Sequence, residues 1–244
     1  MDHWFSLIAS NSELPVAAAV ELHDTGFVVI PGLLTSERLP QIADAYDAAV
    51  SGADPADVRT GGTTIRVHDF VNRGPHFDDL YVSSAILAAC CSVIDRPFKL
   101  STMLARTLNP HTPAQPLHVD FRREVDGWPM VGFIIMVDEF RRDNGATRFL
   151  PGSHKWPTIP ADFPQDPSAN YDGQVLACGP AGSVIIYNGS AWHGHTANRA
   201  GEPRRSIQGA YIRRDAEPAV NQAARIHPET LGRIGHLAKY VLAV

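Results

Sequence analysis

The chain has 244 residues, 44% of them hydrophobic, which fits one large globular domain that buries about three quarters of its unfolded surface without disulfide staples. The formal net charge is −5 with no long run of one sign, and no segment approaches the ~18 apolar residues of a membrane span, so we expect neither a nucleic-acid partner nor a membrane. The cysteines Cys90, Cys91 and Cys178 are odd in number and form no CxxC pair, which predicts buried reduced thiols in a cytoplasmic protein.

Helical patterns dominate the first part of the chain. Alanine-rich and capped stretches favour helices, a short apolar run favours a strand, and a segment rich in Gly, Pro, Asp and Asn favours irregular structure. The predicted elements are a helix over 12–24 that ends near Gly26, a strand over 27–30, a helix from the Thr-Ser-Glu cap at 35–37 to about 50, an irregular segment over 52–80, and a buried helix over 82–94.

From about residue 98 the pattern changes to short strands separated by turns. The predicted strands are 98–108, 117–121, 130–137, 148–150, 174–178, 183–187 and 205–213. Repeated short strands of this kind are typical of a sandwich or jelly roll. Residues 222–241 predict a helix with a break at Pro228.

These elements predict a mainly β protein with α additions, organised as one domain over 1–244. Its expected parts are a helical N-terminal part over about 1–97, a β core over about 98–215 and a helical tail over about 216–244.

The most informative site in the sequence is Leu-His-Val-Asp-Phe at 117–121. In a strand, residues two apart point to the same face, so His118 and Asp120 would enter one space side by side. A buried carboxylate is costly unless it is paired or binds a metal. His193 is the expected third ligand and His195 the alternative, because two histidines and one carboxylate form the arrangement of non-haem Fe(II) oxygenases. With eleven histidines in the chain, HxD alone can arise by chance.

A second constellation, Arg204, Arg205 and Ser206, opens the strand that follows His193. Neighbouring strand residues face opposite sides, so only one of the two arginines enters the core. An inward arginine needs an anionic partner, and the C5 carboxylate of 2-oxoglutarate suits its two-pronged guanidinium. Ser206 shares a face with Arg204 and could add a hydroxyl donor. The alternative is an ordinary surface pair of arginines flanking a strand.

Four stretches together resemble the phytanoyl-CoA dioxygenase family of Fe(II)/2-oxoglutarate oxygenases. They are QPLHVD at 115–120, NGATRFLPGSH at 144–154, GPAGSVIIYNG at 179–189, and HGHTAN at 193–198 followed by Arg204. The resemblance covers about residues 20–215 and implies a double-stranded β-helix, a jelly-roll and cupin-like core. It implies that His118, Asp120 and His193 bind the iron and that Arg204 binds the co-substrate. Gln115 and Ser206 are further candidate co-substrate contacts, as is Thr147, for which packing within the sheet is the alternative.

The chain departs from many relatives at two positions of these motifs. His195 stands where many have a serine near the co-substrate, and Val119 stands where many have glutamine. Neither is an expected iron ligand. The chain is also short for an enzyme of fatty acyl-CoA and shows no basic patch suited to that handle, so the family name is not taken as the substrate.

The activity implied by the resemblance is hydroxylation of an unactivated carbon of a small molecule, with O2 consumed, succinate and CO2 released, and ascorbate supportive in vitro. The same oxidant could serve desaturation, ring closure or epimerisation. Alternatives of other classes are a non-catalytic jelly-roll ligand-binding module and a cupin-type metal enzyme that does not use 2-oxoglutarate. We expect a partly apolar pocket lined by Phe121, Ile134, Met136 and Gln208, whereas Arg66, His68 and Asn72 are expected to be surface residues.

Overall fold

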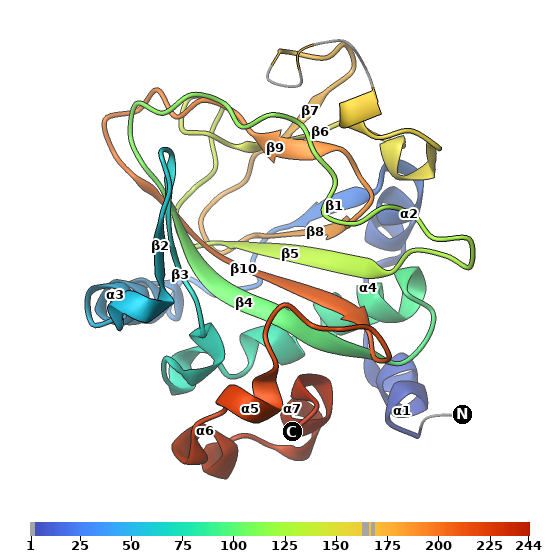
Figure 1. Cartoon of the computed structure of the whole chain (residues 1–244), viewed down its shortest axis with the longest axis vertical. Coiled ribbons are helices and arrows are strands. Elements are labelled where there is room, and N and C mark those ends of the chain that lie inside the picture. The colour runs from blue at the N-terminus through green and yellow to red at the C-terminus, as the bar shows by residue number, and fades with distance from the viewer. Residues whose placement is uncertain (1–2, 163–165, 167–168) are drawn as a thin grey trace.

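Two antiparallel sheets lie one above the other in the computed structural model, which describes residues 3–162, 166 and 169–244 (Figure 1). The major sheet has the strand order β1-β8-β5-β10-β4-β3-β2, and the minor sheet has the order β7-β6-β9. The strands are β1 Phe27–Ile30, β2 Val58–Thr60, β3 Thr64–Val67, β4 Phe98–Leu108, β5 Met130–Met136, β6 Thr147–Phe149, β7 Val175–Ala177, β8 Val184–Asn188, β9 His193–His195 and β10 Arg204–Arg213.

Helices cover the face of the major sheet that points away from the minor sheet. Helix α4 packs on β5 and β8, and the C-terminal α7 packs on β4. The α-helices are α1 His3–Asn11, α2 Val16–Thr25, α3 Leu39–Ser51, α4 Ser84–Val93, α5 Gln222–Arg225, α6 Pro228–Arg233 and α7 His236–Leu242. Short 3-10 helices occupy Pro55–Asp57, Phe70–Asn72, Pro75–Phe77, Leu80–Val82, Ser153–Lys155 and Pro160–Asp162. No helix of the described part is long and apolar enough to cross a membrane.

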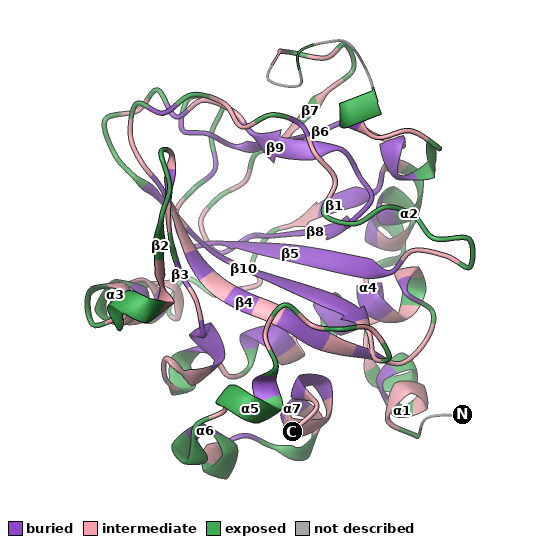
Figure 2. Cartoon of the chain, viewed as in Figure 1, coloured by how far each residue is buried: buried purple, intermediate pink, exposed green. Residues whose placement is uncertain are grey.

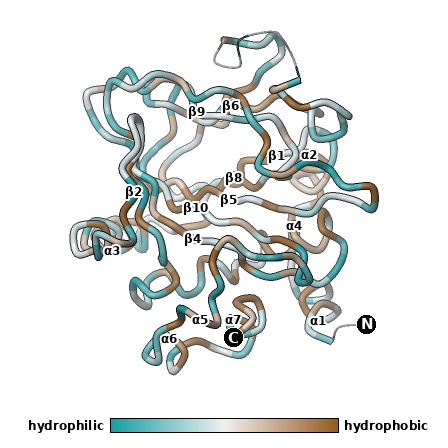
Figure 3. Tube along the Cα trace, in the orientation of Figure 1, coloured by the Kyte–Doolittle hydropathy of each residue, from teal (hydrophilic) through white to brown (hydrophobic). Residues whose placement is uncertain are grey.

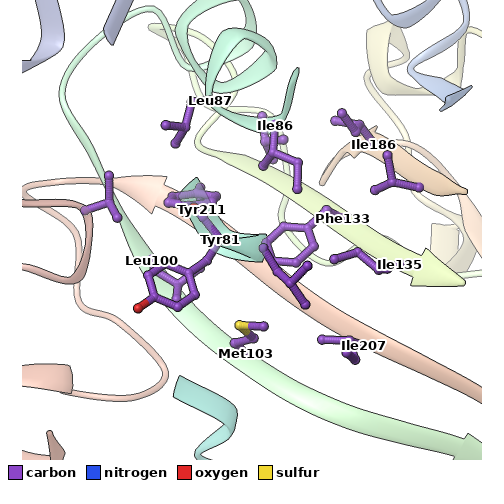
Figure 4. Close-up of a cluster of buried hydrophobic side chains, with 14 of the residues drawn as sticks. Tyr81, Ile86, Leu87, Leu100, Met103, Phe133, Ile135, Ile186, Ile207 and Tyr211 are labelled. Atoms are coloured by element: carbon purple, nitrogen blue, oxygen red, sulfur yellow. Dashed lines mark hydrogen bonds between the residues drawn. The ribbon is translucent and has the colours of Figure 1, made fainter. Parts of the chain in front are cut away.

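Strand alternation gives the major sheet two different faces. On β10, Ile207 and Tyr211 point toward the helices, into the larger hydrophobic core between the major sheet and the helices. Phe133 of β5 lies in the same core (Figure 4). A smaller core that includes Ile134 and Phe149 lies between the two sheets. Strands β5, β6, β8 and β9 are buried throughout, whereas β2 at the sheet edge is mostly exposed (Figure 2). Apolar residues gather along the major sheet and α4, while the outer loops are mostly hydrophilic (Figure 3).

Most predicted elements are present, and the differences have local causes. Helix α2 ends at Gly26, whose φ of 88° is a left-handed cap that glycine adopts freely. Helix α3 begins at Leu39, after the predicted start, because the residues just before it form a turn. The C-terminal helix is broken into three pieces, with Pro228 beginning the second. Cys90 is buried as predicted, but Cys178 is exposed.

Three errors concern segments that build the site. The part predicted to be irregular contains the β2–β3 hairpin, which extends the major sheet beyond β4. Residues 117–121 do not form a strand, because this segment pairs with β9 only through the single bridge His118–His193. The three-residue strand β9 was not predicted. The part of the chain before residue 98, predicted to be mainly helical, thus supplies three strands of the major sheet, β1, β2 and β3.

Candidate metal centre and co-substrate pocket

A pocket of about 320 Å³ lies between the two sheets. Its floor is the inner face of β4, β5 and β10, and its roof includes β9 and the segment around His118. Most of the residues singled out in the sequence line it: Gln115, His118, Asp120, Phe121, Ile134, Thr147, His193, His195, Arg204 and Gln208. Met136 does not line the pocket, contrary to prediction, because it is fully buried in the small core between the sheets.

His118, Asp120 and His193 converge at one edge of this pocket. Each offers one ligand atom, and these atoms all lie within 4.8 Å of one another. The Asp120 carboxylate stands between the rings, with Oδ1 3.7 Å from His118 Nε2 and Oδ2 3.6 Å from His193 Nε2. The main chain supports this arrangement, since the bridge between His118 and His193 joins two of the residues directly. The expected trio is thus brought together although its first two members do not lie in a strand.

The other nitrogen of each ring is held by the backbone. His118 Nδ1 lies 3.1 Å from the carbonyl oxygen of Pro116, and His193 Nδ1 lies 3.0 Å from that of Ala191. A neutral ring that donates its Nδ1 proton to a carbonyl keeps the Nε2 lone pair free for a metal. Burial lowers the pKa of His118 to about 4, with the neighbouring His193 acting in the same direction. His118 is therefore neutral at neutral pH, the form that binds metals.

Tyr187 was missed as a site residue. Its hydroxyl donates a 2.8 Å hydrogen bond to Asp120 Oδ2. Burial raises the pKa of Tyr187 well above its ordinary value, and the Asp120 charge adds to this effect, so the phenol keeps its proton. Its ring reaches Asp120 across Gly132 of β5, where a Cβ would lie only 2.2 Å from the ring. A tyrosine in the otherwise aliphatic run of β8 was the signal available in the sequence.

His195 lies in the pocket but outside the converging trio. It follows His193 by two residues on β9 and stands opposite Thr147 of β6. Its Nδ1 lies 2.9 Å from the carbonyl oxygen of Thr196, and burial lowers its pKa to about 4. Among the described residues, the metal-binding group that the geometry allows contains His118, Asp120 and His193 without His195.

The two neighbouring arginines that open β10, Arg204 and Arg205, point to opposite sides, as the strand alternation predicted. Arg204 is buried in the pocket with its guanidinium 3.7 Å from the centre of the Phe140 ring. Its Nε and Nη1 have no hydrogen-bond partner. Arg205 points to the outside, where it pairs with Asp138 and Asp47. The buried guanidinium therefore has donors free for an anionic ligand.

The remaining predicted co-substrate contacts occupy different positions. Thr147 and Gln115 line the pocket. Ser206 is fully buried, and its hydroxyl donates to the carbonyl oxygen of Arg106 on the neighbouring strand. Ser206 thus has a structural partner in this arrangement.

Three further polar residues line the pocket, and one of them, Arg106, was missed in the sequence. Arg106 lies in the middle of β4, and Arg66 stands opposite it on β3 with His68 just beyond. Arg66 is exposed, as expected of a surface residue, and His68 is half-buried, but both also line the pocket. The hairpin that brings them there was not predicted. Arg106 could have been noticed as a charged residue in a strand of otherwise uncharged neighbours.

Comparison with known proteins identifies the family. A family model described as phytanoyl-CoA dioxygenase (PhyH) matches residues 22–206. The chain belongs to this family. The family membership predicted from the four motifs is confirmed, and so is the enzyme class, because sequence relatives of the chain are dioxygenases.

Two such relatives illustrate the likeness. The dioxygenase trt7 of Aspergillus terreus is 26% identical over 79% of this chain and 71% of its own length. The iron/alpha-ketoglutarate-dependent dioxygenase okaE of Penicillium ochrochloron is 27% identical over 73% of this PhyH-family chain and 63% of its own length.

A solved structure of similar shape is the epimerase SnoN in complex with Fe3+, alpha-ketoglutarate and nogalamycin RO. Its TM-score is 0.68 at 18% identity, and the match covers 87% of this chain and 89% of SnoN. This likeness confirms the predicted fold, a mainly β jelly roll with helices packed on it.

Proposed function

We propose that this PhyH-family chain is an Fe(II)- and 2-oxoglutarate-dependent dioxygenase that oxidises a small molecule. The observation that carries the proposal is the convergence of His118, Asp120 and His193 in the pocket between the sheets. Two imidazoles and one carboxylate on one side of an ion are the donor set of non-haem Fe(II) oxygenases, and they leave positions for further ligands on the other side. Relatives described as dependent on iron and alpha-ketoglutarate support the same reading.

The donor atoms of the trio fit a divalent iron. Both histidines have Nδ1 engaged by a carbonyl oxygen, so both present Nε2 toward Asp120. Tyr187 fixes the carboxylate through its Oδ2. Such outer hydrogen bonds orient metal ligands and raise metal affinity.

Arg204 is the proposed anchor for the C5 carboxylate of 2-oxoglutarate. It is buried, it has two unpartnered nitrogens, and no acidic side chain of the described residues pairs with it. A guanidinium in that state is stabilised by a carboxylate bound through two parallel hydrogen bonds. Thr147 and Gln115 lie in the same pocket and are proposed as secondary contacts, with Ser206 beneath them in the sheet.

The residues of the pocket divide the work of the reaction. Bound iron and 2-oxoglutarate would supply the oxidant from O2, with succinate and CO2 as products. The protein contributes the orientation of both ligands and an apolar, partly closed wall that includes Leu104, Met130 and Ile212. Hydroxylation of a substrate carbon held against this wall is the proposed outcome.

Epimerisation or ring closure is the second outcome to consider. Structures of similar fold include a non-haem alpha ketoglutarate-dependent epimerase and a carbocyclase. These reactions begin from the same oxidant, so the ligand set and Arg204 would serve them equally.

Consumption of 2-oxoglutarate tests the proposal. The purified protein with Fe(II), ascorbate and carboxyl-labelled 2-oxoglutarate is expected to release labelled CO2 and succinate in equal amounts, slowly even without the primary substrate. Asp120→Ala should abolish the release, whereas the exposed Asp143→Ala should leave it unchanged. No release from the native protein at any substrate tried, despite measured iron binding, would favour a ligand-binding module instead.

A further inference from the structure

The pocket carries more positive charge than the proposed co-substrate can balance. Three guanidiniums line it, from Arg66, Arg106 and Arg204, and Asp120 is the sole acidic residue among the lining side chains. A divalent iron would add two further positive charges, and 2-oxoglutarate would bring two negative ones. The charges of the iron and of 2-oxoglutarate cancel, and Asp120 balances one of the three arginines. Two positive charges therefore have no counterpart. Burying unbalanced charge is costly, so the filled pocket calls for another anion.

Arg106 is the guanidinium that lacks compensation. Its Nη1 and Nη2 donate to the amide oxygens of Gln208 and Gln115 over 3.4 and 3.2 Å, and its Nε is shielded from solvent without a partner. No ion pair involving Arg106 is found among the described residues. Burial, assisted by the charge of Arg66, lowers its pKa to about 10, so it remains charged at neutral pH. Arg66 is exposed at the pocket mouth, where water can compensate it.

Arg106 lies one inward pair along the sheet from the co-substrate anchor Arg204. Along the inner face of the sheet, Arg204 stands opposite Leu108, the next inward pair is Ser206 with Arg106, and Ala210 with Thr102 lies further along. Beyond Arg106 the pocket is lined by small and apolar groups, including Met130 and Ile212. A co-substrate anchored on Arg204 lies at one end of this row, which leaves Arg106 facing the end that a second ligand would occupy.

We infer that Arg106 is a specificity-determining residue that binds a carboxylate of the primary substrate, and that this substrate class is small carboxylic acids with an apolar remainder. The inference rests on the proposed function for the assignment of Arg204 to 2-oxoglutarate. The carboxylate would take the free Nε–H and a neighbouring Nη–H of Arg106 as a two-pronged contact. The apolar remainder would lie over Thr102, Ala210 and Ile212, beside the metal centre.

The test uses acetate as a small carboxylate and acetamide as its neutral match, and NMR of the arginine Nε–H groups follows their binding. The Arg106 and Arg204 signals are assigned from their loss in Arg106→Gln and Arg204→Gln. In the metal-free protein, acetate is expected to shift both signals. In protein loaded with diamagnetic Zn(II) and saturating 2-oxoglutarate, acetate should shift Arg106 alone, and acetamide should shift neither.

The comparison of the metal-free and the loaded protein tests the co-substrate site at Arg204 separately from the substrate site at Arg106. If 2-oxoglutarate fails to protect the Arg204 signal from acetate, the proposed co-substrate site is wrong, whatever Arg106 does. If 2-oxoglutarate alone shifts Arg106 and acetate then has no effect on it, Arg106 belongs to the co-substrate site and the inference is overturned. An Arg106 signal that responds to nothing would make it a structural link to Gln115 and Gln208 and would overturn it equally.

Variants extend the test to affinity. Arg106→Gln should raise the Kd of 2-oxoglutarate less than about threefold, whereas Arg204→Gln should raise it at least about tenfold. The exposed Arg66→Gln, which leaves the interior untouched, should weaken acetate binding at Arg106 by about threefold through loss of a neighbouring charge. An equal loss of 2-oxoglutarate affinity in Arg106→Gln and Arg204→Gln would contradict the assignment.

Discussion

Tyr187 holds the Asp120 carboxylate in place through one hydrogen bond from a buried ring. We expect Tyr187→Phe, which keeps the ring and removes the hydroxyl, to weaken metal binding by about 10- to 100-fold while the protein stays folded. Titration of Zn(II) or anaerobic Fe(II) measures the Kd. The matched control is Tyr211→Phe, because that hydroxyl is also buried but donates to the Tyr81 carbonyl oxygen, away from the metal centre. Equal metal affinity in both variants would show that Tyr187 does not support the ligand.

Arg204 and Arg205 offer a second matched pair at the residue scale. Arg204→Lys is expected to raise the Kd of 2-oxoglutarate, because an ammonium cannot reproduce the two-pronged contact of a guanidinium. Losing one charge-assisted bond costs about 1.5–3 kcal/mol, which corresponds to roughly ten- to a hundredfold in affinity. Arg205→Lys should have little effect, since Arg205 pairs with Asp138 and Asp47 outside the pocket. Isothermal titration with N-oxalylglycine measures both, and a larger loss in Arg205→Lys would contradict the assignment.

What the sequence predicts at the residue scale depends on how local the signal is. His118, Asp120 and His193 carry a recognisable spacing, and the choice between Arg204 and Arg205 follows from strand alternation alone. Tyr187 bonds to Asp120 and Arg106 bonds to Gln208, and both partners lie far along the chain, so these roles appear only when the strands are placed side by side.

At the scale of elements, β5 and β8 pack closely against each other in the site. A Cβ at Gly132 would meet the Tyr187 ring at 2.2 Å, so the ring can cross β5 only over a glycine. We expect Gly132→Ala to destabilise the fold by about 1–3 kcal/mol, as overpacking commonly does, and to weaken metal binding by displacing Tyr187. Urea unfolding and metal titration measure the two effects. Gly232→Ala, with no atom near its Cβ, is the control, and a stable Gly132→Ala with full metal affinity would refute this role.

The elements that the sequence predicted well are those whose own pattern sets their burial. The long strands β4, β5 and β10 show runs of apolar and β-branched residues because one or both faces are buried. Strand β9 has only three residues, His-Gly-His, and is extended because it pairs with β6. The β2–β3 hairpin is short and polar, with Gly61 and Gly62 at its turn, and pairing with β4 makes it part of the sheet. Such elements are specified by partners rather than by local pattern.

For the whole molecule, two buried neutral histidines link stability to pH. Burial lowers the pKa of His154 and of His195 to about 4, below the ordinary value of 6.5. The unfolded chain therefore binds more protons between these values, and the free energy of unfolding of the metal-free protein should fall as pH drops from about 6.5 toward 4. Thermal or urea unfolding across this range measures it. In His154→Gln the slope with pH should be smaller, and an unchanged slope would exclude His154 as a source.

The pocket of the whole molecule exists because the two sheets form two layers, with β9 and the segment around His118 lying over the major sheet. The central claim is that this arrangement makes an iron centre which binds 2-oxoglutarate directly. Iron(II) chelated by a 2-oxo acid gives a visible metal-to-ligand charge-transfer band under anaerobic conditions. The most direct measurement is therefore the anaerobic spectrum of the native protein with Fe(II) and 2-oxoglutarate, beside His193→Ala and His195→Ala. We predict the band in the native protein and in His195→Ala, and its loss in His193→Ala; a native protein without the band, or a band that survives in His193→Ala and is lost in His195→Ala, would contradict the account.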